Sequence, residues 1–287
     1  MSFFRKLLKI APMTTADGAF TPSPLALKLA TSKTTDYDGG VYEAPYTGTQ
    51  HRVLIVCTQE QNMVMANGKK FSTGNHPVEL GVPMLHILQA GFEVDIVTPT
   101  GAPVVIEQWA MPEADENVQG LFRDYADAFA NPGSLADFVA HKMNDDAPYI
   151  GVYIPGGHGS MLGLPDNADL GKLLRWAHQR DTYTLALCHG PAALLAAQDD
   201  ADFIYAGYKI AAFPDAVDKQ TPSIGYMPGH MPWMFGEKLR ALGVTLVNKK
   251  ADASCHADRR LITGASPQAA NPFGRLAATA LLNAVKS

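Results

Sequence analysis

The sequence predicts a doubly wound α/β fold with a mostly parallel sheet flanked by helices. Residues 52–57 form a short apolar run typical of a buried strand, residues 77–91 have a helical pattern that ends at a glycine, and residues 92–98 form a second strand. A strand, a helix and a strand within about 45 residues form a β-α-β unit, which implies that the two strands are parallel. The alternation resumes at residue 149, and residues 183–197 run from a strand through a tight turn into an apolar helix. In such folds, ligands bind beyond the carboxyl ends of the strands.

The remaining elements follow the same alternation. Strands are expected at 149–154, 208–213, 244–248 and 260–263, and helices at 134–143, 166–180, 232–242 and 272–285.

One segment breaks the alternation. Residues 101–147 are polar and interrupted by prolines, and they are too long for a connecting loop. We expect residues 1–50 plus 101–147 to form a small lobe. Residues 51–100 plus 148–287 then form the α/β domain, which carries the catalytic residues.

Composition limits the classes of function. The chain has 287 residues, 47% of them hydrophobic and 18% charged, with a net charge of −5 and no basic block, so nucleic acid is not expected as its main partner. No apolar run approaches the ~18 residues of a membrane span. Arg5, Lys6 and Lys9 interrupt the apolar start, which argues against a signal peptide. The chain has three cysteines, a small and odd number that does not suit a disulfide framework. This predicts a protein of the reducing cytoplasm.

Cys188 is the predicted nucleophile. It lies at the turn between a strand and a helix, where the unpaired N–H groups of the helix favour a thiolate, as in a nucleophile elbow. The alternative is a buried structural cysteine. Cys57 and Cys255 lie at no such turn and are taken as structural or incidental.

Further candidate residues follow other strands. His189 could act as the base or lie on the surface only, and Asp215 could orient that histidine or be a plain turn residue. Gly156 and Gly157 offer backbone N–H groups suited to an oxyanion, although such a pair also occurs in ordinary turns.

Glu79 lies in the first turn of its predicted helix, where a carboxylate is stabilised in any case. In a functional role it would exchange a proton with the thiol. A carboxylate beside a thiolate is a like-charge pair, so one member keeps a proton near neutrality, and we expect it to be Glu79.

Several motifs together resemble a known family. Pro155-Gly-Gly-His-Gly159 followed by Cys188-His-Gly-Pro191 resembles the PfpI-like superfamily, which has a flavodoxin-like, class I glutamine amidotransferase-like fold. The motifs outside this pair resemble its HchA branch. They are Phe71-Ser-Thr-Gly-Asn-His-Pro77 with Glu79, Trp109-Ala-Met-Pro112, Ala212-Phe-Pro-Asp215, Asp218-Lys-Gln-Thr-Pro222 and Ile224-Gly-Tyr-Met-Pro-Gly-His230.

The resemblance implies a set of roles. The branch comprises heat-shock-associated holding chaperones, glutathione-independent glyoxalases (glyoxalase III) and protein deglycases, and it implies a homodimer. Carried over to this chain, it gives Cys188 as nucleophile, His189 and Asp215 as its partners, Glu79 as the acidic neighbour, and backbone N–H groups near Gly157 and His189 as oxyanion donors.

The resulting hypothesis is a cofactor-independent enzyme, a lyase or hydrolase, that acts on small 2-oxoaldehydes. It would convert methylglyoxal to lactate through a cysteine hemithioacetal, and it would also deglycate early adducts on Cys, Lys and Arg side chains. Two alternatives stay open. One is a stress-induced holding chaperone that binds unfolded proteins on an exposed apolar surface, and the other is a cysteine peptidase.

A departure from the branch predicts that no metal is bound. Some members carry a site of two histidines and one glutamate, and the matching positions here are Leu88, Glu93 and Tyr125. A single carboxylate cannot hold zinc, which needs three or four ligands. His86 is two positions from Leu88, about 200° around the helix, so its ring should point to the other side.

Overall fold

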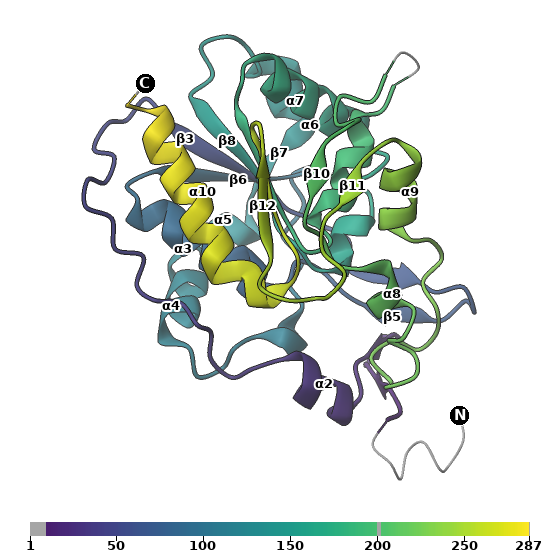
Figure 1. The fold of residues 1–287 in the computed structure, drawn as a ribbon. Coiled ribbons are helices and arrows are strands. Elements are labelled where there is room, and N and C mark those ends of the chain that lie inside the picture. Colours follow the sequence, from purple (N-terminus) through teal and green to yellow (C-terminus); the bar gives the residue numbers. More distant parts are fainter. Residues whose placement is uncertain (1–9, 200–201, 287) are drawn as a thin grey trace.

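The computed structural model describes residues 10–199 and 202–286. Its centre is a seven-stranded sheet in the order β12-β13-β9-β8-β3-β6-β7, in which only the edge pair β12–β13 is antiparallel (Figure 1). The strands are β3 (Arg52–Val56), β6 (Glu93–Thr98), β7 (Gly133–Ser134), β8 (Tyr149–Ile154), β9 (Tyr183–Leu187), β12 (Cys255–Asp258) and β13 (Leu261–Gly264). This confirms the predicted α/β class with a mostly parallel sheet.

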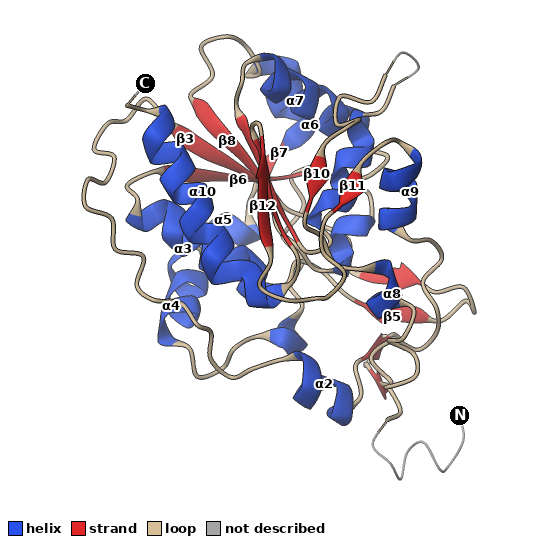
Figure 2. Cartoon of the chain, in the orientation of Figure 1, coloured by secondary structure: helices blue, strands red, loops and turns tan. Residues whose placement is uncertain are grey.

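Helices cover both faces of the sheet (Figure 2). One face carries α3 (Pro77–Gln89), α4 (Glu116–Asp124), α5 (Ala126–Ala130) and α10 (Ala270–Ala284), and the other carries α6 (Leu135–His141), α7 (Ala168–Gln179), the 3₁₀ segment η3 (Gly190–Ala197) and α9 (Phe235–Ala241). Successive side chains of β3 alternate between the two cores, because a strand points its residues to opposite faces in turn. Leu54 belongs to one core and Ile55 to the other, which is why this strand is apolar throughout.

Several small elements lie outside the seven-stranded sheet. A four-stranded sheet joins β1 (Met13–Thr14), β2 (Phe20–Thr21), β5 (Lys70–Ser72) and β4 (Asn62–Val64), and β10 (Lys209–Ile210) pairs with β11 (Thr245–Leu246). The short helices are α2 (Pro24–Ala30), η1 (Gln108–Ala110), η2 (His158–Met161), α8 (Asp215–Asp218) and η4 (Pro267–Ala269).

The predicted lobe boundaries are wrong in two places. Strand β7, from within residues 101–147, extends the main sheet beside β6, and α6 packs on α7. This placement covers an open sheet edge and buries Leu135 and Phe138 in the main core. Strand β2 pairs with β5, so residues 1–50 share a sheet with residues assigned to the α/β domain. A small lobe within the rest of these segments stays a prediction.

Sequence patterns also missed some elements. Strand β12 has polar residues and lies at an edge of the sheet, and α2 and α4 were not expected. The apolar segment after Cys188 is a 3₁₀ helix rather than an α-helix. The start of the chain, which contains Arg5, Lys6 and Lys9, lies outside the described residues. Among the described helices, none has the length and apolar character needed to cross a membrane.

Candidate active site

Cys188 follows β9 directly and adopts a left-handed backbone conformation with φ of 60°. Its N–H donates to the Gly264 carbonyl at 2.8 Å, and its carbonyl accepts from Phe213 N–H at 3.0 Å, so neighbouring segments hold the turn. A non-glycine residue in this region costs energy and persists only where the surrounding structure imposes it. The predicted elbow is therefore present at the carboxyl end of the sheet.

His189 links the thiol to a carboxylate. Its Nδ1 lies 3.3 Å from Cys188 Sγ, and its Nε2 lies 2.9 Å from Asp218 Oδ2. With the ring proton on Nε2 donated to Asp218, Nδ1 has a free lone pair that can accept the thiol proton. Burial alone would raise the pKa of Asp218, but His189 and His158 outweigh it and hold that pKa well below its usual value. Cys188, His189 and Asp218 thus form the geometry of a nucleophile–base–acid triad.

The predicted role of Asp215 is wrong. Its carboxylate accepts from the Gly236 N–H at 3.0 Å and pairs with Arg240 of α9, and it does not contact His189. Asp215 and Asp218 are the first and last residues of the four-residue helix α8, so their side chains reach different neighbours. The sequence led to the right segment and the wrong carboxylate. The motif Asp218-Lys-Gln-Thr-Pro222 already contained the correct one.

His158 is a site residue that sequence reasoning missed, although it lies in the Pro155–Gly159 motif. Its Nε2 lies 3.1 Å from Asp218 Oδ1, and its ring centroid is 3.9 Å from that of His189. Burial lowers the pKa of His158, which keeps the ring neutral. Asp218 therefore receives one ring N–H from each histidine.

Glu79 lies beside the thiol from the first turn of α3. Its side chain is fully buried, and the Tyr153 hydroxyl donates to its backbone carbonyl, which fixes the start of the helix. Burial raises the pKa of Glu79 well above its usual value, against the opposing effect of the Cys188 thiol and the Gly157 N–H. This agrees with the expectation that Glu79 carries a proton near neutrality.

The expected low pKa of the Cys188 thiol is not what the structure shows. The residue is only 3% exposed. Burial raises the pKa of the thiol well above its usual value, and the Glu79 carboxyl group raises it further. Desolvation of a buried charge outweighs the favourable dipole of a following helical turn. The thiol therefore needs a base, and His189 is the group in contact with it.

Gly156 and Gly157 are required by close packing. A Cβ atom on Gly156 would overlap the Glu79 carboxyl group, and one on Gly157, where φ is 100°, would lie 2.6 Å from His76 N. Oxyanion binding by Gly156, Gly157 and His189 stays a prediction.

These groups meet on a cavity of about 260 Å³. Its inner wall carries Glu79, Glu107, Gly157, His158, Cys188 and His189, and its mouth is lined by residues of α2, of residues 217–226 and of η4. Among the described residues that line it, none is a lysine or an arginine.

The structure also bears on metal binding. His158, His189 and Asp218 offer ligand atoms within 4.8 Å of one another, but both histidine Nε2 atoms already bond to the carboxylate. Glu93, the one residue that matches a carboxylate of the metal site in the HchA branch, pairs with the Arg52 guanidinium. Both ring nitrogens of His86 have partners, the Tyr42 hydroxyl at 2.8 Å and Asn271 Oδ1 at 2.7 Å.

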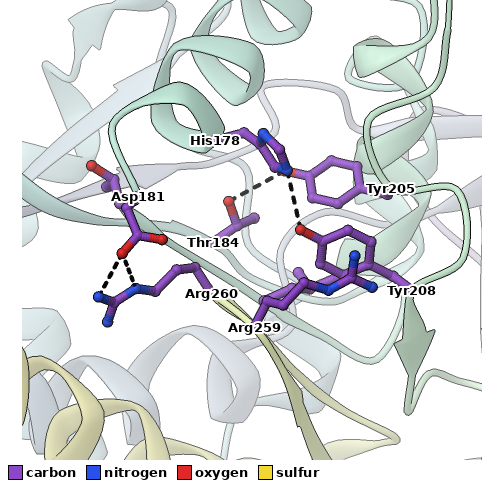
Figure 3. Close-up of a pocket in the computed structure, with 9 residues that line it drawn as sticks. His178, Asp181, Thr184, Tyr205, Tyr208, Arg259 and Arg260 are labelled. Carbon is purple, nitrogen blue, oxygen red and sulfur yellow. Dashed lines mark hydrogen bonds and ion pairs between the residues drawn. The ribbon is translucent and has the colours of Figure 1, made fainter.

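A second cavity, of about 230 Å³, lies at the opposite end of the sheet, beside the first residues of β9 and β13 (Figure 3). Its polar side chains pair with one another. His178 Nε2 lies 3.1 Å from the Tyr208 hydroxyl, and Arg260 pairs with Asp181 at 2.6 Å. The nucleophile is absent from this cavity, so the site beyond the carboxyl ends is the candidate active site.

Comparison with known proteins identifies the family of the chain. A model of the DJ-1/PfpI family matches residues 70–280. The chain is 46% identical over 271 residues to "Protein/nucleic acid deglycase HchA" of Escherichia coli O7:K1, covering 94% of this chain and 95% of that protein. It is also 46% identical, over 268 residues, to the protein of the same name from Escherichia coli O157:H7, covering 93% of this chain and 94% of that protein. Solved structures with the same fold include one titled "Crystallographic structure of APC35852" (TM-score 0.68, 27% identity, 81% of this chain and 98% of that one). Another is glyoxalase III from Candida albicans (TM-score 0.62, 23% identity, 80% of this chain and 98% of that one). This chain belongs to the DJ-1/PfpI family.

Proposed function

We propose that this protein is a glutathione-independent glyoxalase that converts methylglyoxal to lactate, and that it also deglycates protein adducts of methylglyoxal. The observation that carries the proposal is the Cys188–His189–Asp218 triad with Glu79 beside the sulfur, all on one cavity. The 46% identity to a protein named a deglycase supports the same class of substrate.

The first step is addition of sulfur to the aldehyde. His189 Nδ1 takes the thiol proton, Cys188 sulfur bonds to the aldehyde carbon C1, and the C1–O π electrons move to oxygen. That oxygen then takes the proton back from His189, which gives a neutral hemithioacetal. Asp218 stabilises the imidazolium that exists between the two transfers, and it fixes the tautomer.

The second step moves a proton from C1 to C2. Glu79 suits this step in the fraction of the enzyme in which it is ionised, because burial, which raises its pKa, makes that carboxylate a stronger base than one in water. Neither nitrogen of His189 is as free, since both already have partners. The product is a lactoyl thioester on Cys188, and water hydrolyses it to lactate and the free thiol.

Deglycation uses the same thiol. In an early adduct on a lysine or arginine side chain, C1 carries the amine nitrogen and a hydroxyl group. Attack by sulfur on C1 breaks the C1–N bond, the amine leaves with the proton held by His189, and the same hemithioacetal results.

Two finer statements belong to this proposal. We place the protein in the cytoplasm. We also propose that it is a homodimer, which light scattering on the purified protein tests directly. The alternative of a holding chaperone draws on Leu29 and Ile224, two exposed apolar side chains at the mouth of the cavity.

The test is lactate production from methylglyoxal by the purified protein without glutathione. We expect turnover by the wild type and none by Cys188→Ala. A holding chaperone would instead suppress aggregation equally well with and without the thiol. Absence of lactate from a folded wild-type protein would refute the proposed function.

A further inference from the structure

Glu107 is a second buried carboxyl group on the same cavity. It precedes η1, its residue is only 1% exposed, and its backbone N–H donates to the Asn75 carbonyl at 3.0 Å. The Thr73 hydroxyl donates to its Oε1 at 2.6 Å. Its Oε2 is buried and has no hydrogen-bond partner among the described residues. A buried carboxyl oxygen without a partner is costly unless a ligand or water meets it.

The surroundings of Glu107 compensate its charge only in part. Burial raises the pKa of Glu107 to about 7, although the His158 side chain, the Thr73 hydroxyl and the backbone N–H groups of His158 and Gly74 act in the opposite direction. The other titratable groups that interact with it are Glu79, Cys188 and Tyr226, none of which is a cation. As no lysine or arginine lines the cavity in the part of the chain described, no permanent cation neutralises this carboxylate.

We propose that Glu107 is the second acid of this site. It donates a proton to the oxygen on C2 of the substrate while Cys188 holds C1, and it thereby restricts the site to short, uncharged 2-oxoaldehydes. This inference rests on the proposed glyoxalase function and extends it to a further catalytic residue and to the charge of the substrate.

The proton and electron transfers balance with both carboxyl groups. As the Glu79 carboxylate takes the C1 proton, the C1–H electron pair forms a C1–C2 double bond. The C2–O π pair moves to oxygen, which takes the Glu107 proton. Glu79 then returns its proton to C2, and the C1 hydroxyl gives its proton to the Glu107 carboxylate as the thioester carbonyl forms. Each carboxyl group ends in the state in which this step began, with Glu79 ionised and Glu107 protonated, and no other reactant is needed.

The same arrangement disfavours anionic substrates. Glyoxylate has the reactive aldehyde but carries a carboxylate where methylglyoxal has its acetyl group. That carboxylate would lie against Glu107 in a cavity that none of the described lysines or arginines lines, and burial of an unpaired charge is unfavourable. Burial also lowers the pKa of His76 to about 3, so this neighbouring ring provides no positive charge.

The variant Glu107→Gln tests the proposal, with Glu116→Gln on the exposed face of α4 as the matched control. The amide can accept from Thr73 but cannot give up a proton. We expect kcat to fall by about 10²-fold or more, the usual effect of losing a positioned acid, with a small change in KM. Glu107 acts as an acid, so wild-type kcat should fall as the pH rises through about 7, and this alkaline decline should be absent in the variant.

A second measurement separates this proposal from the proposed function. Methylglyoxal should protect Cys188 from iodoacetamide in both wild type and Glu107→Gln, because hemithioacetal formation does not use Glu107. Failure of methylglyoxal to react with the wild type refutes the proposed function. A wild-type kcat and pH profile in Glu107→Gln refutes the role of Glu107 alone.

The wild-type protein gives a test that does not depend on how the variant folds. Above neutral pH, methylglyoxal should protect Cys188 and glyoxylate should not. Equal protection by glyoxylate would overturn the inference about substrate charge.

Discussion

The substitution Gly156→Ala adds a single methyl group, which should push the Glu79 carboxyl group away from the Cys188 thiol. The Cβ atom of Gly156→Ala would overlap Glu79 Oε2, and it would lie 2.6 Å from the Leu187 carbonyl oxygen and 2.8 Å from Cys188 Cβ. Ordinary contacts of a Cβ atom begin at 3.4 Å, so the Glu79 carboxyl group must retreat by about 1 Å or the elbow must move. Displacements of about 1 Å in a catalytic group cost on the order of 10²-fold in rate. We therefore expect kcat to fall by roughly that factor.

The assay is lactate production from methylglyoxal, with thermal unfolding measured on the same preparations. Overpacking of this kind costs about 1–3 kcal/mol of folding free energy, so the variant should fold with a lower Tm. The control is Gly81→Ala on the same helix as Glu79, where the nearest side-chain atoms lie 3.4 Å from the added Cβ. A folded Gly156→Ala protein with wild-type kcat would refute the view that Glu79 must lie beside the thiol.

Four other predictions follow from the site. Glu79→Gln should fold normally and lower kcat by about 10²–10⁴-fold, and wild-type turnover would reduce Glu79 to a helix-end residue. Asp218→Asn should lower kcat by a similar factor, because it removes the carboxylate that holds His189. Asp215→Asn should lower Tm, because the ion pair with Arg240 is lost, and should leave kcat nearly unchanged. A larger loss of kcat in Asp215→Asn than in Asp218→Asn would restore the sequence-based assignment. Burial and the Glu79 carboxyl group raise the pKa of the Cys188 thiol, so the rate of its alkylation by iodoacetamide should have a pH midpoint above ~8.5. Glu79→Gln should move that midpoint to lower pH, and mass spectrometry across a pH series measures both midpoints. Elemental analysis should find no stoichiometric zinc and EDTA should leave turnover unchanged, while zinc coordinated by Glu93 would contradict the expected absence of a metal site.

Local sequence patterns predicted the parts of the site that are set by the order of strands and turns along the chain. The strand that ends at Leu187, the turn at Cys188 and the glycines after β8 are visible in sequence because a buried strand is apolar and a tight approach requires glycine. Their convergence follows from the parallel sheet, whose carboxyl ends share one edge.

The features that sequence reasoning missed depend on tertiary contacts. The choice between Asp215 and Asp218 is set by where a four-residue helix lies relative to His189 and by the position of Arg240, neither of which a local pattern specifies. His158 reaches Asp218 across 60 residues of chain. The pKa of the Cys188 thiol depends on burial, which outweighs the local helical dipole that sequence alone suggests.

Other missed features have a similar cause. Strand β12 is an edge strand with polar side chains, so it has no apolar run to reveal it. Strand β7 contains only two residues, too few for a periodic pattern.

The central claim is that Cys188 bonds to the aldehyde carbon and that Glu79 then moves the proton that makes the product. Peptide mass spectrometry after brief exposure of Glu79→Gln to methylglyoxal tests both parts at once. We predict one methylglyoxal adduct on the Cys188 peptide and no lactate in solution, whereas the wild type releases lactate and retains no adduct. An adduct on Cys57 or Cys255 with Cys188 unmodified, or lactate release by Glu79→Gln at the wild-type rate, would contradict the account.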